Sequence, residues 1–330
     1  MGVWSVAADV AVKVTIVGFV ALAAARLCAS GPARLRYRLW IAALLAAAVV
    51  PIVALGRLAM SAAAGVPTNG FVALRATPAS VTTLGFVVWL TVAAVMIGGL
   101  IRDLAHLRAM RRAATQAPGD WQPDATRLAT QLGIEYPVRI VVSDQSTTPM
   151  CWGVWRPTIV LPTGWQAWSP SLRESVLRHE LRHLSQCDPA VRVLERMLAA
   201  LLWFCPAIWL IVQRTSRERE VACDESVLAA GADPFEYASE LVMLAKLARH
   251  VPAAAQAFVR QSELEHRVAM MLDHRTASFR RTMITSLAAA VAIAGVISAK
   301  PVVAVNHVSV RVQSSDPPGA GPATFRTHPR

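Results

Sequence analysis

The stretch Val81–Ile101, with the sequence VTTLGFVVWLTVAAVMIGGLI, decides the class of fold because its 21 residues include no charged side chain. A helix needs about 20 mainly apolar residues to cross the hydrocarbon core of a bilayer. A helix buried in the core of a soluble protein is the alternative for any single stretch of this kind. The number of such stretches in the chain therefore decides between the two.

Three further stretches are almost as apolar: Val14–Leu27, Trp40–Leu55 and Met283–Ala299. The composition agrees with them, since the 330 residues are 55 % hydrophobic and 16 % charged. Soluble globular chains carry about 25 % charged residues, so these fractions disfavour both a wholly soluble enzyme and a disordered protein. We therefore expect a mainly α membrane protein with four transmembrane helices, at about residues 10–29, 40–57, 81–101 and 283–299.

Basic residues flank one end of each predicted span. They follow the first and third spans and precede the fourth, at Arg26, Arg34, Arg36, Arg38, Arg102, Arg108, Arg111, Arg112, Arg275, Arg280 and Arg281. Because basic loops stay on the cytoplasmic side, we expect residues 102–282 to form a cytoplasmic domain. The N-terminus and a short disordered tail, 300–330, are expected outside. No Lys or Arg precedes Lys13, so we expect no cleaved signal peptide.

The predicted cytoplasmic region has the charge balance of a soluble domain. It holds 22 of the 33 Lys and Arg and 19 of the 21 Asp and Glu, so its net charge is only +3 against +12 for the chain. No basic run interleaved with aromatic residues stands out, which argues against direct nucleic-acid binding. The five cysteines are an odd number in a reducing compartment, so we expect no disulfide framework.

A small β element precedes the main helices of this region. A helical pattern over 103–135 is broken at Pro118-Gly119, and two strands follow at Val138–Ser143 and Pro157–Leu161. An extended substrate is expected to add as a further strand beside the 156–161 edge. The pattern predicts an α+β domain.

Start and stop signals mark the helices that follow. Ser171 and Glu174 fit a capping box for a helix that runs to Cys187. Asp188-Pro189 then predicts an N-cap and a first-turn proline. Pro206 interrupts this second helix. A third helix is expected from about residue 207 to 230, ended by Gly231, and a fourth from Asp233-Pro234.

The first of these helices contains HELRH at 179–183. His179 and His183 are i and i+4 and share one face, so both imidazoles can reach one Zn²⁺ ion at about 2.0–2.1 Å. Glu180 is rotated from the first histidine by about 100° and is expected to be the general base. This is the HExxH pattern of zinc peptidases. A surface helix with two solvated histidines beside Arg178 and Arg182 is the alternative.

The sequence EVACD at 220–224 offers a third ligand. A catalytic zinc site uses three protein ligands and keeps one open position. Glu220 can supply the third ligand, and Asp224, one turn further on, can accept the ring N–H of a liganding histidine and fix its tautomer. An ordinary acidic helix face paired with residues such as Arg217 is the alternative.

Together these motifs resemble the BlaR/MecR-type antirepressor metallopeptidases, which are membrane-embedded bacterial gluzincins. The resemblance covers roughly residues 138–245 in detail. It rests on HELRH (179–183), EVACD (220–224), LWFCPAIW (202–209), STTPMCWG (146–153) and RPTIVLP (156–162).

The resemblance implies a zincin-like domain in which His179, His183 and Glu220 bind Zn²⁺, Glu180 is the general base and Asp224 holds a liganding histidine. It implies a cytoplasmic protein substrate, such as a BlaI/MecI-like repressor, and self-cleavage in loops of the kind found at 274–281. We expect that basic loop to be a positive-inside anchor instead. The sensors of the family also carry a large extracellular penicillin-binding domain. Only about 30 residues follow the fourth predicted span, without Ser-x-x-Lys, so no attached β-lactam sensor is expected.

The apolar segment 198–212 lies between the predicted metal ligands. A single membrane crossing there would separate Glu220 from both histidines, and two crossings do not fit. We therefore expect a buried or interfacial helix pair that docks the domain on membrane lipid.

Two other functions stay open. A housekeeping membrane protease of the CAAX-prenyl-peptidase or heat-shock type would need spans between the two ligand helices, and the chain has no room for them. A non-enzymatic receptor or scaffold with a vestigial metal site is opposed by the intact ligand set. His250 and His266 are candidate oxyanion stabilisers, with solvated surface histidines as the alternative. Asp9 and Lys13 are expected to form an interfacial, snorkelling pair, with a buried functional pair as the alternative.

Overall fold

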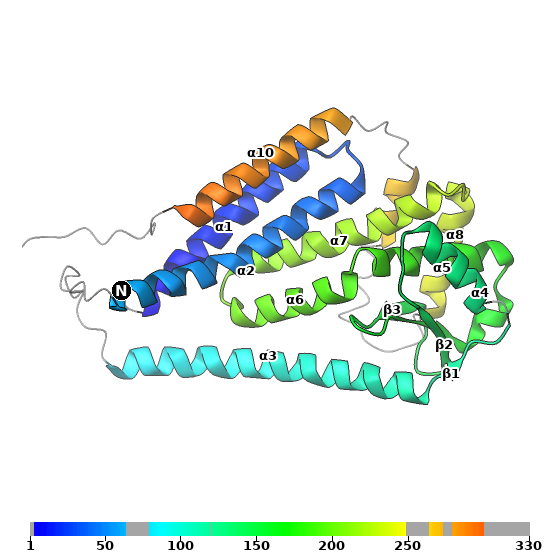
Figure 1. Ribbon diagram of the computed structural model, residues 1–330, viewed down its shortest axis with the longest axis horizontal. Coiled ribbons are helices and arrows are strands. Elements are labelled where there is room, and N and C mark those ends of the chain that lie inside the picture. Colours follow the sequence, from blue (N-terminus) through cyan, green and yellow to red (C-terminus); the bar gives the residue numbers. More distant parts are fainter. Residues whose placement is uncertain (1–2, 64–78, 120, 249–263, 273–278, 300–330) are drawn as a thin grey trace, which may run out of the picture.

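The computed structural model of the chain describes residues 3–63, 79–119, 121–248, 264–272 and 279–299 (Figure 1). His250, most of the 274–281 segment and the tail 300–330 lie outside the described residues.

Long apolar helices make up the first third of the chain. They are α1 (Val3–Leu27), α2 (Ala33–Ala63) and α3 (Ala79–Ala113). All three are long and apolar enough to cross a membrane, over Trp4–Leu27, Ala33–Met60 and Thr83–Ala113. Helix α10 (Phe279–Ser298) lies where the fourth span was expected. Its described apolar part, Ala288–Ser298, is shorter, so a fourth crossing stays a prediction.

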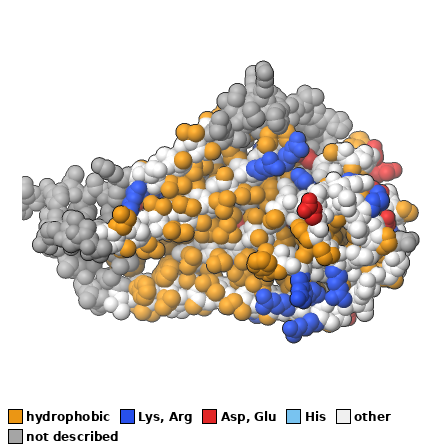
Figure 2. Space-filling view, viewed as in Figure 1, with side chains coloured by type: hydrophobic (Ala, Val, Ile, Leu, Met, Phe, Trp, Pro, Cys, Tyr) orange, Lys and Arg blue, Asp and Glu red, His pale blue; other side chains and the backbone are white. Residues whose placement is uncertain are grey.

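Helices α1, α2 and α10 lie side by side, whereas α3 runs apart from them (Figure 1). Only 6 % of the most apolar window of α3 is buried, and Figure 2 shows a broad apolar surface over the helical part of the molecule. Because soluble proteins rarely expose apolar patches of this extent, such a surface fits a lipid environment.

The C-terminal end of α10 is bound by charged side chains of α1 and α2. Lys13 forms an ion pair of 3.0 Å with Asp9 and donates to the carbonyl of Ala299 at 3.3 Å, and Arg57 donates to the same carbonyl at 2.7 Å. Asp9 and Lys13 are 4 % and 3 % exposed, so the predicted snorkelling pair is wrong. A cation is stabilised beside the carbonyls at a helix C-terminus, which accounts for its burial there.

A helical hairpin enters the same layer as α1. Helix α6 (Asp188–Leu201) turns into α7 (Pro206–Leu228), and Cys205 and Ile208 of this turn pack in one apolar cluster with residues of α1 and α2. Gly18, in the middle of α1, faces Ala207, with only 3.6 Å between the Ala207 Cβ and the position a Cβ would take on Gly18. One side of the segment 198–212 is therefore buried against the apolar helices, while Leu201, Phe204 and Trp209 are exposed. Its docking on membrane lipid stays a prediction.

The β element is larger than the two predicted strands. A four-stranded sheet has the order β1-β2-β4-β3, with β1 at Thr115–Gln116, β2 at Arg139–Ser143, β3 at Met150–Trp152 and β4 at Thr158–Pro162. Strands β2 and β4 are parallel, and β3 pairs antiparallel with β4. Strand β4 thus has neighbours on both sides, so the prediction of a free edge at 156–161 is wrong. The edge strand on that side is β3.

Alternate residues of the sheet face different helices. On one face, Ile140, Ile159 and Leu161 pack with α4 (Trp121–Gln131) and α5 (Pro170–Ser185). On the other face, Val141 and Val160 pack with the end of α3. This alternation follows from the two-residue period of a strand, and it fixes α5 against the sheet.

Two of the predicted helix starts are displaced. Ser169, not Ser171, accepts the N–H of Leu172 and caps α5, so the predicted capping box is wrong. Cys187 takes the N-cap position of α6 in a left-handed conformation with φ of 57°, and Asp188 is already helical. Helix α8 (Pro234–Ala248) starts as expected, since Asp233 accepts the N–H groups of Phe235 and Glu236.

Candidate metal centre

Helix α5 presents two histidines on the face opposite its sheet contact. Leu177 and Leu181 pack on the sheet side, while His179 and His183 are buried, with ring centroids 4.9 Å apart. The spacing of one helical turn brings the rings together, as the HELRH pattern predicts.

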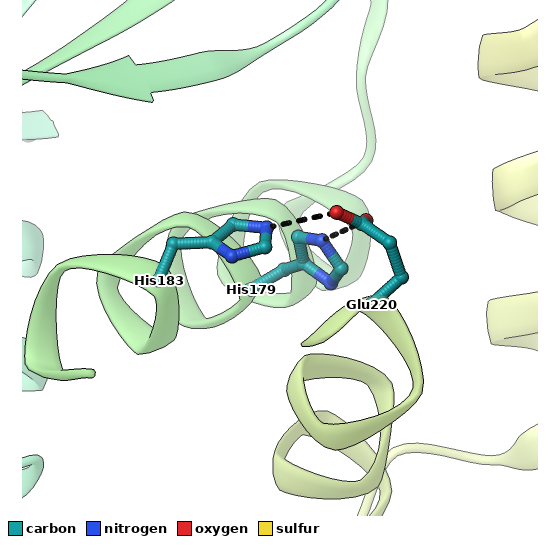
Figure 3. A group of neighbouring side chains, drawn as sticks. All are labelled: His179, His183 and Glu220. Atoms are coloured by element: carbon teal, nitrogen blue, oxygen red, sulfur yellow. Dashed lines mark ion pairs between the residues drawn. The ribbon is translucent and has the colours of Figure 1, made fainter. Parts of the chain in front are cut away.

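Helix α7 brings the carboxylate of Glu220 to both rings (Figure 3). The Nε2 atom of His179 lies 3.6 Å from Glu220 Oε2, and the Nε2 atom of His183 lies 3.8 Å from Oε1. One ligand atom from each of the three residues can be chosen so that all lie within 4.8 Å of one another. The structure therefore brings together the three residues predicted to hold the ion.

The Nδ1 atom of each histidine contacts a carboxylate on the side of the ring away from Glu220. His183 Nδ1 lies 2.7 Å from Asp188 Oδ2. His179 Nδ1 lies 3.1 Å from the Tyr237 hydroxyl and 3.2 Å from Asp224 Oδ1. Ionised carboxylates only accept hydrogen bonds, so each Nδ1 carries the proton. In the neutral rings that a metal ion requires, each Nε2 turns an unshared electron pair towards Glu220.

This donor set fits a divalent cation. Two imidazole lone pairs and a carboxylate face one another at distances too long for direct hydrogen bonds. Tetrahedral ligands at about 2.0–2.1 Å from one ion would be about 3.4 Å apart, close to the two separations given above. Two His nitrogens and one carboxylate oxygen are ordinary ligands of zinc.

Charged neighbours set the electrostatics of the centre. Burial alone lowers the pKa of His179, but the carboxylates of Asp224 and Glu220 outweigh it and raise the pKa to about 9. Burial alone raises the pKa of Glu220, but His183 and Arg267 are among the groups that hold it well below its usual range. The raised pKa of His179 shows that the carboxylates around this ring stabilise a positive charge there.

Glu180 lies on the side of α5 that faces strand β3. It is 8 % exposed, and helix α5 contacts β3. Burial raises the pKa of the Cys151 thiol on β3, and a hydrogen bond with Glu180 raises it further. The carboxylate predicted to be the general base is thus beside the edge strand of the sheet.

Three residues of the centre were not predicted. Asp188 was taken only for a helix cap, although its place five residues after His183 is a signal that could have been used. Tyr237 donates to Asp224 at 2.9 Å. Arg267, in the helical segment 264–272, binds both oxygens of Asp224 at 2.7 Å. No pattern in the sequence marks the last two. His266 is exposed, and no described contact joins it to this group.

The sequence of the chain matches a known protein family. The model of the BlaR1 peptidase M56 family matches residues 4–271, which is most of the chain. The chain belongs to this family. The match confirms the predicted resemblance, and it includes the apolar helices α1 to α3 as well as both ligand helices.

A similar protein is the Regulatory protein BlaR1 of Bacillus licheniformis. It is 33 % identical over 81 residues, which cover 24 % of this chain and 14 % of that protein. The chain thus aligns with only a small part of that relative's length. The family is named for the BlaR1 peptidase, and the three long apolar helices of this chain agree with a membrane protein.

Proposed function

We propose that the chain is a membrane-embedded, zinc-dependent endopeptidase that acts in regulatory proteolysis. One observation supports this proposal most directly: His179, His183 and Glu220 lie together, and the Nδ1 atom of each histidine contacts the carboxylate of Asp224 or Asp188. A carboxylate that holds the far ring nitrogen of a ligand is the usual support of a histidine–zinc site.

Each side chain has a distinct role in this proposal. His179, His183 and Glu220 hold Zn²⁺ and leave one position open. When bound there, zinc supplies a Lewis acid that polarises the scissile carbonyl and makes water more acidic. Glu180 takes a proton from the attacking water and delivers it to the leaving amine. Asp224 keeps the His179 ring in the required tautomer.

The substrate backbone would bind along strand β3. Among the described strands, β3 pairs with β4 alone, and an extended peptide can add to an open edge through main-chain hydrogen bonds. Glu180 lies against Cys151 of this strand, so a peptide on β3 would pass the general base. This position replaces the 156–161 edge expected from the sequence.

The proposal also covers topology and partner. Helices α1, α2, α3 and α10 would each cross a bacterial inner membrane, with the N-terminus and the 300–330 tail outside and the 102–282 domain in the cytoplasm. The substrate would be a cytoplasmic protein such as a BlaI/MecI-like repressor. The name of the Bacillus relative as a regulatory protein supports a role in regulation.

Substitution of the general base tests the proposal. Purified full-length protein carrying Glu180→Gln should retain about one zinc per chain but lose cleavage of an unfolded test protein and of a BlaI/MecI-like repressor. The control Glu174→Gln makes the same charge change on α5 at an exposed site, half accessible to solvent, and should retain both properties. Equal cleavage by wild type and Glu180→Gln would reject the peptidase mechanism. Equal signalling without any cleavage would favour the non-enzymatic receptor.

A further inference from the structure

The apolar helix α2 reaches the candidate metal centre through one hydroxyl group. Tyr37, in the second turn of α2, is 0 % exposed and donates a hydrogen bond to Asp188 Oδ1. The other oxygen of Asp188 lies 2.7 Å from His183 Nδ1. A continuous path of hydroxyl, carboxylate and imidazole therefore joins a candidate membrane span to a residue proposed to hold the metal.

The hydroxyl determines how the carboxylate is oriented. Asp188 is 1 % exposed, and a buried carboxylate is costly unless both oxygens have partners. Besides Tyr37, the guanidinium of Arg219 approaches Asp188 Oδ1, but its Nε is 3.7 Å away. Arg219 itself is bound to Glu195. Without the hydroxyl, the carboxylate would turn towards Arg219, and its contact with His183 would change.

The cytoplasmic end of α2 is also fixed to the helix that carries Glu220. The backbone N–H of Ala33 donates to the Glu225 carboxylate at 2.8 and 2.9 Å. Arg36 binds Glu218 at 2.8 Å. Glu218 and Glu225 lie on α7, on either side of Glu220. A displacement of the first turns of α2 would therefore act on both ligand helices.

We propose that Tyr37 is a positioning residue for His183, acting through Asp188, and that α2 thereby sets the geometry of the metal centre. The proposal rests on the proposed zinc site. It deepens that proposal by naming the membrane helix through which a change outside the domain reaches the metal.

The test compares two tyrosines in purified full-length protein. Tyr37→Phe removes one hydroxyl from the path, whereas Tyr136→Phe removes a hydrogen bond of 3.0 Å to the carbonyl of Leu184, next to His183 on α5. Two properties are measured: the zinc dissociation constant, by chelator competition, and the visible absorption of the Co²⁺-substituted protein. We expect Tyr37→Phe to weaken zinc binding about tenfold, since such supporting partners are worth about 10–100-fold, and to shift the cobalt bands. Tyr136→Phe should do neither.

Asp188→Asn provides a second variant, because it keeps Tyr37 and breaks the next link. It should shift the cobalt bands as well. If Tyr37→Phe lowers the thermal midpoint but leaves the cobalt spectrum and zinc affinity of wild type, Tyr37 is only structural and the inference is overturned. If Tyr37→Phe does not fold, an unshifted spectrum in Asp188→Asn overturns it. Failure of the wild type to bind Co²⁺ or Zn²⁺ in a one-to-one ratio would instead reject the proposed function.

Discussion

Replacement of Glu220 by Gln is the most direct test of the candidate metal centre. The variant keeps the size of the side chain and one oxygen but removes the negative charge between the two His Nε2 atoms. Arg192 and Arg267 lie 3.4 and 3.6 Å from the carboxylate, so these cations would then face a neutral amide beside the metal. Both effects weaken cation binding.

The magnitude follows from the number of ligands. Four-ligand zinc sites in small domains bind with about 10–16 kcal/mol, or about 3 kcal/mol per ligand. A loss of about 3 kcal/mol of binding free energy corresponds to a dissociation constant about 100 times larger. The two facing arginines place the expected loss at or above this value.

The assay is a competition titration of zinc between purified full-length protein and a chromophoric chelator. Glu174→Gln is the matched control, since it changes the net charge equally on an exposed part of α5. It should bind zinc as the wild type does. A dissociation constant for Glu220→Gln within threefold of wild type would refute the assignment of Glu220 as a ligand.

Three further predictions concern stability. Removal of zinc by a chelator should lower the free energy of unfolding by about 2.7 kcal/mol, compared with protein in free zinc at 100 times the zinc dissociation constant. The thermal midpoint should fall on chelation and be restored by zinc but not by magnesium. Glu195→Ala should cost up to about 3–5 kcal/mol, because it removes the nearest carboxylate from buried Arg219 and leaves Asp188 at 3.7 Å. Glu174→Ala, at an exposed pair, should cost less than about 1 kcal/mol, so equal midpoints in a denaturant titration would contradict this. Ser169→Ala should cost about 1 kcal/mol as the loss of a helix cap, and Ser171→Ala should cost less, so a reversed order would show that the cap is misassigned.

Local periodicity was enough to predict the parts of the centre that lie on single helices. The four-residue spacing of His179 and His183 fixes their common face whatever the rest of the chain does. The same holds for Glu220 and Asp224. That these two pairs would meet could be predicted only from the family resemblance, because no local rule sets the crossing of α5 and α7.

The parts that were missed depend on tertiary contacts or on unusual backbone geometry. The left-handed conformation of Cys187 moves the cap one residue back, so that Asp188 turns its carboxylate to His183 instead of to its own backbone. Strand β3 has three residues, and its pairing with β4 decides which edge of the sheet is open. Arg267 lies 43 residues from Asp224 in the chain, beyond any helical or strand period.

The length of α7 sets the distance between Glu220 and the middle of α1. Helix α7 begins beside the middle of α1 and reaches Glu220 fourteen residues later, a rise of about 21 Å. On the proposed topology, this distance brings the reactive carboxylates to the level of the lipid headgroups. On that topology, a peptide bond in an extended segment would reach this plane more readily than one inside a compact globular protein. On this proposal, we expect partners with a long extended linker, or with a segment already lying on the inner leaflet, to be cut most readily.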